Sequence, residues 1–551
     1  MGALSSRRKD KCLSLSEVTV PVLIIGGGPV GLSLSIDLGW RGVDCLMVER
    51  RDGSVGHPKM NQVGNRTQEF CRRWGLGKKV REHSIPEDFP RNIHFLTSVT
   101  GFELGRYEFP ARRDVIQPYS PEFMQRCSQI YFDPLLRDAA GEMPNVMQMF
   151  NTTLDRFEQD DGSVTAYVID EKSGEEKIIT AKYLVACDGA ESEIREQLGI
   201  KLVGDHNMSF NVNLFFKSAD HDALFNKGRA TMQWMFNEEG MWADIVSING
   251  HDLWRLSIMK LPPGSELTKE EAADYLRKAV GRDFDFEILS ILPWMRKRVV
   301  ADQFSVGRIH LAGDAAHQMS PTGGFGMNTG IGEAVDLGWK LAAVLEGWGG
   351  EKLLESYDAE RRPIAQMIAD EGARNYTQFA KLPNGPEINQ NTHEGEVFRK
   401  QFTKKLYDLE MDREYDTDGI VLGYRYEGSP IIVPDETPEP EFNAMVYTET
   451  ARPGHRAPHA WFGESEETST LDLFGRDFIL MRFDLSVSVD TLVEAFGIRS
   501  VPLTVEDIDQ ENIFDIYERK LVLVRPDGHV AWRGDNCPSD ALVVADIVRG
   551  A

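Results

Sequence analysis

The chain has 551 residues, of which 41% are hydrophobic and 27% charged, and a formal net charge of −26. This length predicts about three structural units of an ordinary globular protein, and the acidic balance argues against nucleic-acid binding, which needs clustered Lys and Arg. No run approaches the ~18 apolar residues of a membrane span or the apolar core of a signal peptide, so we expect a cytoplasmic protein.

Residues 1–18 are polar and predict a disordered tail. They contain MGALSS, which matches the N-myristoylation pattern, and four basic residues, Arg7, Arg8, Lys9 and Lys11. A lipid chain and a basic patch together satisfy the two-signal rule for membrane anchoring. Because the pattern is short, we favour a solvated tail that stays off the membrane.

A strand, a glycine turn, a helix and a second strand follow, in the runs VPVLII, GGGPVG, LSLSIDLGWRG and VDCLMVE. The turn carries Gly26, Gly28 and Gly31, and Glu49 closes the second strand. In dinucleotide-binding units such glycines permit a tight turn, the helix start binds the pyrophosphate, and the acidic residue accepts a hydrogen bond from a ribose hydroxyl. An acidic residue there disfavours a 2′-phosphate and favours FAD or NAD.

The middle of the chain predicts a helix followed by strands. The run SPEFMQRCSQIYFDPLLRDAAG has a helical pattern, in which Asp133-Pro134 predicts a break. Strand-like runs dominate from 145 to 260, and their alternation predicts a largely antiparallel sheet. YLVAC is the exception, since its continuous apolar residues predict a buried strand that leads into Asp188-Gly189.

A glycine-rich stretch follows a second buried strand, RIHLA. In LAGDAAHQMSPTGGFGMNTG, Asp314 comes directly after the strand, and five glycines precede a long helical pattern. Glycine is tolerated where the backbone needs unusual angles or must approach a ligand. A glycine loop that opens a helix also directs free N–H groups toward an anion.

The end of the chain predicts a separate unit. The segment Glu427–Asn443 contains four prolines, so we expect a linker over 416–445 and a small α/β domain over 446–551. Its elements are the strand DFILMRF, two strands joined at a Pro-Asp-Gly turn, and a final helix. The six cysteines have neither CxxC nor zinc spacing, so we expect reduced thiols, no metal site, and a structural or subunit-contact role for this domain.

These motifs together resemble the group A flavoprotein aromatic hydroxylases, the family of p-hydroxybenzoate hydroxylase and phenol hydroxylase. The stretches that resemble this family are VLIIGGGPVG, YLVACDGAESEIR, RIHLAGDAAHQMSPTGGFGMNTG and LLESYDAERRP. RPGHRAPHAWF and LVLVRPDGHVAWR resemble the thioredoxin-like tail of the phenol and polyketide hydroxylase branch. The resemblance implies an α/β fold: a Rossmann-like FAD-binding domain over 19–415, an interleaved mixed or antiparallel substrate domain mainly at 90–125 and 200–300, and a thioredoxin-like domain without CxxC.

The resemblance also implies non-covalent FAD, with NAD(P)H as a transient co-substrate and NADPH slightly preferred. Asp314 would bond the ribityl chain, the Pro321–Met327 loop would lie along the isoalloxazine, and Asp188 would sit near the pyrophosphate and the nicotinamide path. Arg66 and Gln129 match positions that contact phosphates or the ribityl chain. The expected cofactor-binding residues are Gly26, Gly28, Gly31, Glu49, Arg50, Arg66, Gln129, Asp188, Asp314, Pro321, Gly324, Gly326, Met327 and Asn328.

The implied reaction is hydroxylation of a phenolic or related aromatic ring. NAD(P)H reduces FAD, O2 adds at flavin C4a, and the hydroperoxide transfers OH to the ring, while the protein orients the substrate and excludes water. Baeyer–Villiger or epoxidising chemistry on a polyketide-like substrate and an FAD-dependent reductase remain alternatives. An NAD-dependent dehydrogenase would leave Asp188 and Asp314 without a purpose. The resemblance allows a homodimer.

The residue that deprotonates the substrate is not assigned by sequence. Some relatives carry a histidine base where this chain has Asn61, an amide that cannot act as a base. His57 is a candidate by proximity, against the alternative of a solvent-exposed loop histidine, and Pro321 is a third candidate. Relatives often have I-Q-D where this chain has Ile331-Gly332-Glu333, and we expect His317 to be structural.

The region Phe210–Met259 is expected to cover the substrate. Its aromatic and sulfur side chains suit an aromatic guest, although for any single one of them a place in the core is the more common role. The candidate substrate residues are Met232, Trp234, Phe236, Trp242 and Arg255.

Overall fold

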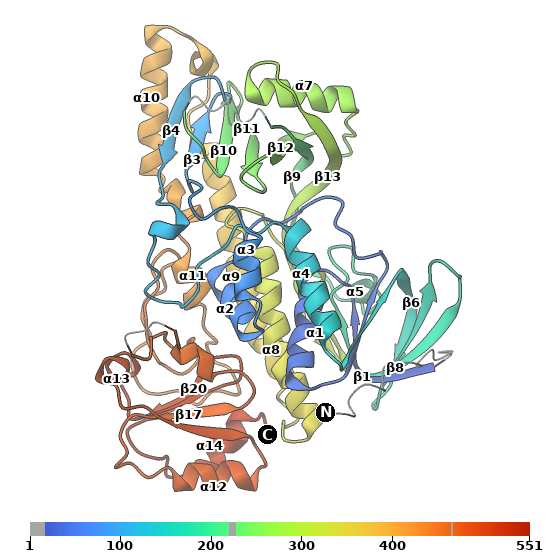
Figure 1. The fold of residues 1–551 in the computed structure, drawn as a ribbon, viewed down its shortest axis with the longest axis vertical. Coiled ribbons are helices and arrows are strands. Elements are labelled where there is room, and N and C mark those ends of the chain that lie inside the picture. The colour runs from blue at the N-terminus through green and yellow to red at the C-terminus, as the bar shows by residue number, and fades with distance from the viewer. Residues whose placement is uncertain (1–16, 220–226, 464–466) are drawn as a thin grey trace, which may run out of the picture.

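The computed structural model describes residues 17–219, 227–463 and 467–551. The lipidation pattern and residues 1–16 of the predicted disordered tail lie outside these residues, whereas Glu17 and Val18, the last two residues of that predicted tail, belong to a strand. The described residues form two eight-stranded sheets and one four-stranded sheet. In Figure 1 the strands β3, β4 and β9 to β13 lie at the top of the molecule, and β1, β6 and β8 lie below them, beside the C-terminal domain. In the described part of the chain, no helix is long and apolar enough to cross a membrane.

The first sheet has the order β14-β15-β8-β1-β2-β5, and β7 and β6 continue from β8. Strands β1, β2, β5, β8 and β15 pair in parallel. The near-continuous apolar runs of β1, β2, β8 and β15 agree with this, because consecutive residues of these strands are buried at their paired ends. The strands are β1 (Glu17–Ile25), β2 (Cys45–Glu49), β5 (Val146–Phe150), β6 (Thr152–Gln159), β7 (Val164–Asp170), β8 (Glu176–Ala186), β14 (Ser305–Val306) and β15 (Ile309–Leu311).

The second sheet has the order β16-β13-β9-β12-β11-β10-β3-β4 and is antiparallel except where β10 pairs with β3. The predicted strands between 145 and 260 therefore divide between two sheets. The strands of the second sheet are β3 (Ile93–Leu96), β4 (Glu103–Tyr107), β9 (Leu202–Lys217), β10 (Met232–Asn237), β11 (Gly240–Ser247), β12 (Leu253–Leu261), β13 (Glu287–Ala301) and β16 (His317–Gln318).

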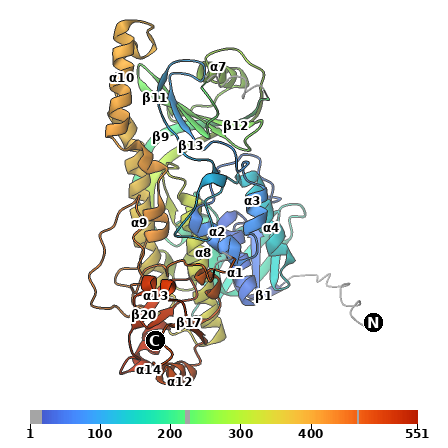
Figure 2. The ribbon, with the colours of Figure 1, turned by 60° about the vertical axis from the view of Figure 1, so that its left-hand side comes forward.

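Helices connect and cover these sheets. Those before the C-terminal domain are α1 (Pro29–Arg41), α2 (Asn65–Arg73), α3 (Gly77–Glu82), α4 (Gln129–Glu142), α5 (Glu193–Gln197), α7 (Lys269–Val280), α8 (Gly326–Glu346), α9 (Glu355–Gln378), α10 (His393–Asp408) and α11 (Asp418–Gly423). Short 3-10 turns are η1 (Arg112–Asp114), η2 (Gly313–Ala315), η3 (Phe379–Lys381), η4 (Pro386–Asn389) and η5 (Met411–Glu414). In both views α9 lies between the second sheet and the C-terminal domain (Figure 1 and Figure 2).

The break predicted at Asp133-Pro134 is wrong, because Pro134 lies inside the continuous helix α4. A proline there removes one backbone hydrogen bond and crowds the preceding turn. Phe132, Leu136 and Ala140 of α4 are fully buried. Their packing against the first sheet stabilises the helix more than the lost bond destabilises it.

The C-terminal domain is a four-stranded sheet of order β18-β17-β19-β20 with three helices and a 3-10 turn. Its elements are η6 (Thr470–Leu473), β17 (Phe478–Arg482), α12 (Asp490–Ile498), β18 (Leu503–Asp507), α13 (Glu511–Tyr517), β19 (Leu521–Val524), β20 (Val530–Gly534) and α14 (Ala541–Val548). The proline-rich segment before it has no helix or strand, but it hydrogen-bonds to the domain, from Val433 N to Ala531 O at 2.9 Å.

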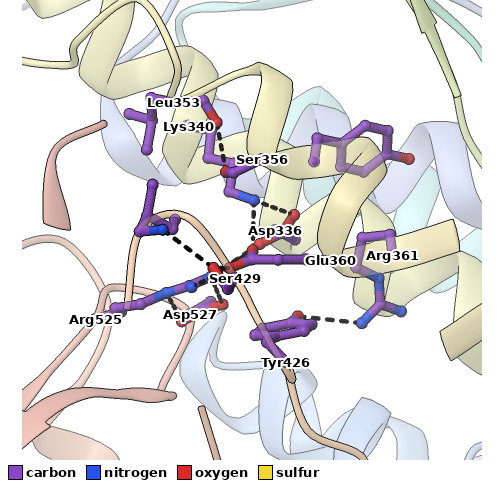
Figure 3. A network of polar contacts seen from close by, with 12 residues as sticks. Asp336, Lys340, Leu353, Ser356, Glu360, Arg361, Tyr426, Ser429, Arg525 and Asp527 are labelled. Carbon is purple, nitrogen blue, oxygen red and sulfur yellow. Dashed lines mark hydrogen bonds and ion pairs between the residues drawn. The ribbon is translucent and has the colours of Figure 1, made fainter. Parts of the chain in front are cut away.

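A network of buried charged residues links this domain to helices α8 and α9 (Figure 3). Lys340 of α8 lies 2.8 Å from Asp336 and 2.7 Å from Glu360 of α9. Arg525 reaches from the C-terminal domain to Glu360 at 2.5 Å and pairs with Asp527 at 2.7 Å. Because these charges are all buried, removing any one would leave its partners uncompensated.

Candidate active site

One cavity of about 850 Å³ runs from the carboxyl end of the first sheet to the face of the second sheet. Its walls come from segments far apart in the chain. At one end they are the glycine turn after β1, the end of β2 and the loops around Asp188 and Asp314. At the other end they are side chains of β10, β11, β12 and β13 together with Glu414 and Tyr415.

The three fingerprint glycines have distinct roles. Gly26 has a φ of 111°, and a Cβ there would lie 2.2 Å from the carbonyl oxygen of Cys187. A Cβ on Gly31 would lie 2.0 Å from the Gly26 carbonyl, so this glycine allows α1 to pack on the turn without lining the cavity. Gly28 lines the cavity and has nothing within 4 Å of its Cβ position. The space beside Gly28, at the start of α1, suits a phosphate group.

Glu49 closes β2 at the cavity wall. Its carboxylate accepts hydrogen bonds from the backbone N–H groups of Gly27 at 2.7 Å and Arg51 at 2.8 Å. These bonds hold the carboxylate beside the glycine turn, where a ribose hydroxyl would reach it. The next residue, Arg50, is exposed and also lines the cavity.

Gln129 begins α4 and faces the same end of the cavity. Its Oε1 accepts a hydrogen bond from the backbone N–H of Lys59 at 3.0 Å, and its Nε2 donates one to the Asp133 carboxyl group at 2.9 Å. Burial raises the pKa of Asp133 to about 7. Gln129 therefore fastens the loop that carries His57 to α4.

Two carboxyl groups face the cavity from neighbouring strand ends. Asp188 follows β8, burial raises its pKa, and its Oδ1 has no hydrogen-bond partner among the described residues. Asp314 lies in η2 after β15. Its side chain is exposed to the cavity, and the surrounding protein atoms raise its pKa. Such oxygens are suited to accept hydrogen bonds from ligand hydroxyls.

The turn that carries Asp314 is held from behind by Glu333 of α8. The Glu333 carboxylate accepts a hydrogen bond from the backbone N–H of Gly313 at 2.8 Å and pairs with His317 Nε2 at 2.8 Å. Burial alone would lower the pKa of His317, but the Glu333 carboxylate outweighs it and the pKa is raised. Glu333, a departure from the family pattern, therefore positions the Asp314 turn together with His317.

The glycine loop Pro321–Met327 forms one wall of the cavity. Gly323 and Gly324 have φ angles of 92° and 68°, which side chains rarely adopt. Pro321, Gly324, Gly326 and Met327 line the cavity, as expected for residues beside a ligand.

Asn328 does not line the cavity, because both ends of its amide hold the loop in place. Its Oδ1 accepts from Gly64 N at 2.8 Å and Thr67 Oγ1 at 2.7 Å, and its Nδ2 donates to the Gly324 carbonyl at 2.7 Å. Asn328 thus ties the glycine loop to α2.

Arg66 is also absent from the cavity wall. Its guanidinium donates to Glu69 at 2.7 Å and to the Asp527 carbonyl of the C-terminal domain at 2.7 Å. Burial would raise the pKa of Glu69, but Arg456 and Arg66 outweigh it and hold the pKa at about 2. Arg66 therefore forms an ion pair within α2 and a hydrogen bond to the C-terminal domain, and it does not line the cavity.

One row of residues across the second sheet faces the cavity. Met232 of β10 pairs with Val246 of β11, which pairs with Arg255 of β12. Through β9 the row continues to Ser290 of β13. Four residues of this row, Met232, Val246, Arg255 and Ser290, line the cavity.

The other three predicted substrate residues lie in cores. Trp234 follows Met232 on the same face of β10, but it packs 4.4 Å from the Phe379 ring, and Phe236 is buried in the same cluster. Trp242 packs under α7 on the opposite face of the sheet. Strand alternation shows which residues share a face, but α9 and α10 cover most of this face, so only its end is open.

The sequence candidates for deprotonation all lie at the cavity. His57 Nδ1 lies 2.8 Å from Ser290 Oγ, and burial, Arg255 and Lys59 lower the pKa of His57 to about 4. His57 is therefore half-buried at the site, not an exposed loop residue. Asn61 donates to the Ser247 carbonyl at 2.9 Å, and its Oδ1 has no partner among the described residues. Pro321 contributes only backbone and ring carbons.

Arg126, Glu414 and Tyr415 also line the cavity and belong to no sequence motif. Burial and the nearby Arg91 lower the pKa of Arg126 to about 10. Burial raises the pKa of Glu414 to about 8, and Tyr415 accepts a 2.7 Å hydrogen bond from Trp234 Nε1. Only tertiary folding brings these residues together, and no pattern in the sequence identifies them.

The residues at the glycine-turn end fit FAD. The open space beside Gly28, the helix start, the fixed Glu49 carboxylate and the unpartnered Asp188 oxygen match the phosphates and hydroxyls of a dinucleotide. In the described ranges, no cluster of His, Cys, Asp or Glu is arranged to hold a metal ion.

Two family models match the chain. The FAD binding domain model matches residues 19–372, and the model of the aromatic-ring hydroxylase C-terminal domain matches residues 450–547. A putative polyketide hydroxylase from Streptomyces halstedii is 35% identical over 93% of both chains. The FAD-dependent monooxygenase apdD from Emericella nidulans is 31% identical over 94% of this chain and 88% of its own.

Solved structures agree. The rebeccamycin biosynthetic enzyme RebC with bound 7-carboxy-K252c has a TM-score of 0.91 and 39% identity, covering 97% of this chain and 100% of its own. The structure of aklavinone-11 hydroxylase with FAD and aklavinone has a TM-score of 0.82 and 28% identity, and the match covers 97% of this chain and 99% of that one. The chain therefore belongs to the FAD-dependent monooxygenases of the aromatic-ring hydroxylase family.

Proposed function

We propose that this monooxygenase uses NAD(P)H and O2 to hydroxylate a fused-ring phenolic substrate. The observation that carries the proposal is the single cavity that joins the Gly28 turn and Asp314 to the Met232 row. A cofactor and an aromatic guest share that space without a wall between them. RebC and aklavinone-11 hydroxylase, whose structures contain 7-carboxy-K252c and aklavinone, support a large guest.

FAD, when bound, supplies the transfer of electrons from NAD(P)H and the activation of oxygen. The start of α1 beside Gly28 would hold the pyrophosphate, Glu49 a ribose hydroxyl, and Asp314 the ribityl chain. The Pro321–Met327 loop and the start of α8 would lie beside the ring system, where backbone N–H groups favour negative charge. We propose NADPH over NADH as the reductant.

The substrate end of the cavity combines apolar and cationic groups. Met232, Val246 and Leu292 offer an apolar surface for aromatic rings. Arg126 and Arg255 face the same space and would stabilise oxygen substituents that carry or develop negative charge. A ring bearing hydroxyl or other oxygen groups fits this combination.

A second candidate is Baeyer–Villiger or epoxidising chemistry on a polyketide-like substrate. Its support is the match to a polyketide hydroxylase and to the tetracenomycin A2 monooxygenase-dioxygenase of Streptomyces glaucescens, which is 30% identical over 96% of this chain. The isolated product separates the candidates, since hydroxylation retains the aromatic ring.

The test is aerobic oxidation of NADPH and of NADH by the FAD-loaded protein with 1-naphthol, alizarin, phenol and 4-nitrocatechol. We expect a fused-ring phenol to stimulate NADPH oxidation at least ~10-fold more than the single-ring phenols, with a hydroxylated product. Equal stimulation by single-ring phenols would contradict the substrate class. Oxidation that no aromatic stimulates, or that yields only hydrogen peroxide with every one, would contradict hydroxylation.

A further inference from the structure

Glu414, at the end of η5, is a carboxyl group that no motif accounts for. It is only 6% exposed, yet it lines the cavity. One carboxylate oxygen accepts a hydrogen bond from the backbone N–H of Gly323, in the glycine loop. The other, Oε2, has no hydrogen-bond partner in the described part of the chain. The carboxyl group therefore lies where the expected flavin wall meets the substrate end, and one of its oxygens is buried without a hydrogen-bond partner among the described residues.

The charges around Glu414 come from several elements. Arg296 of β13 and Arg126 favour its ionised form, whereas burial and Asp244 of β11 oppose it. Arg296 is itself fixed by Ser320 Oγ at 2.5 Å and by the Tyr376 ring of α9, 4.0 Å from its guanidinium. Burial has the largest effect, so the pKa stands at about 8.

The hydroxyl of Tyr415, the next residue, accepts a hydrogen bond from Trp234 Nε1. Arg255 of β12 carries a further positive charge that acts on Asp244. Tyr415 and Arg255 thus line the same cavity as Glu414.

The other groups at this end are poorer proton acceptors. Burial, Arg255 and Lys59 lower the pKa of His57 to about 4, whereas burial raises the pKa of Glu414, so Glu414 is the stronger base of the two. Asn61 offers an oxygen that accepts a hydrogen bond but takes up no proton. A general base works best when its pKa lies near the operating pH.

We propose that Glu414 is the catalytic residue that takes the proton from the substrate hydroxyl. The phenolic O–H bond breaks, the proton moves to the Glu414 carboxylate, and the electron pair stays on the phenolic oxygen. The charge is conserved and nothing is oxidised in this step. Arg126 and Arg255 stabilise the resulting phenolate, whose electron-rich ring is then ready for oxygenation. The inference rests on the proposed function, because it needs a phenolic substrate.

Infrared difference spectroscopy on the FAD-loaded protein tests the proton transfer directly. 1-Naphthol is added at pH 9, where the Glu414 carboxyl is ionised in the free protein. Binding should produce the C=O band of a protonated carboxylic acid, and labelling with 13C-glutamate should shift it. The band should be absent in Glu414→Gln. It should persist in Glu449→Gln, which removes another carboxyl whose burial raises its pKa but which lies outside the cavity.

Turnover gives a second readout. In Glu414→Gln, kcat should fall at least ~100-fold, KM should change little, and kcat/KM should lose its dependence on pH around 8. Glu414→Asp should restore part of the rate, and equal FAD content would show that each variant folds. A glutamate band that persists in Glu414→Gln, or naphthol binding without any band, would overturn the role of Glu414 alone. Failure of naphthol to bind the wild-type protein would overturn the substrate class, and this inference with it.

Discussion

His317 Nε2 lies 2.8 Å from Glu333 Oε1, and the other oxygen of the same carboxylate holds the Gly313 N–H at 2.8 Å. Both contacts are buried, and they join helix α8 to the turn that presents Asp314 to the cavity. An ion pair outside the cavity wall thus holds the turn that carries a carboxyl group on that wall.

His317→Asn should weaken FAD binding about 10-fold, because the Asp314 turn loses its charged support. Since the folded-state pKa of His317 is raised, its contribution is full below about pH 6.5 and is lost as pH rises through the folded-state value. FAD fluorescence titrations at pH 6 and pH 9 should show a larger effect of the substitution at pH 6. His83→Asn, at an exposed histidine, serves as control. An equal effect at both pH values would contradict the charged pair.

Gly26 and Gly28 should respond differently to a side chain. Gly28 has extended backbone angles, φ −77° and ψ −179°, and open space beside it, so Gly28→Val should fold normally. It should bind FAD at least ~10-fold more weakly, a loss of about 1.4 kcal/mol. Gly26→Val should destabilise the fold itself, because of its positive φ and the Cys187 carbonyl. Thermal unfolding and FAD content measured on both variants check this, and similar melting of the two would contradict the assignment.

Arg525→Met should destabilise the protein by about 3–5 kcal/mol, because Glu360 and Asp336 keep their charges in a buried site. Chemical denaturation provides the measurement. Arg482→Met removes an exposed ion pair with Asp507 in the same domain and should leave stability unchanged within error. If both variants unfold at the same denaturant concentration as wild type, the network does not join the domains energetically.

Met232 should limit the size of the substrate. Met232→Trp narrows the cavity and should weaken alizarin binding at least ~10-fold while sparing FAD affinity. Met235→Leu, in the core on the opposite face of β10, conserves volume and should change neither. Absorbance titration with alizarin distinguishes them. Undiminished alizarin binding by Met232→Trp would place the aromatic guest elsewhere.

The sequence predicted the cofactor end of the site better than the substrate end. The glycine turn, Glu49, Asp188 and Asp314 stand beside strand ends, where local pattern and geometry coincide. Asn328 and Arg66 matched the pattern, but tertiary partners occupy their side chains. Trp234 shares a face with Met232, and nothing local shows that Phe379 covers it. Glu414 and Arg126 reach the cavity only through the packing of distant segments.

The most direct test of the account is oxygen-isotope incorporation by the FAD-loaded protein supplied with NADPH and fused-ring phenols under 18O2. We predict one 18O atom in each molecule of hydroxylated product, one NADPH consumed per product, and no label when the isotope is supplied as H2 18O. Label from water, or NADPH oxidation that yields hydrogen peroxide while the bound phenol stays unchanged, would contradict a cavity in which cofactor and substrate react together.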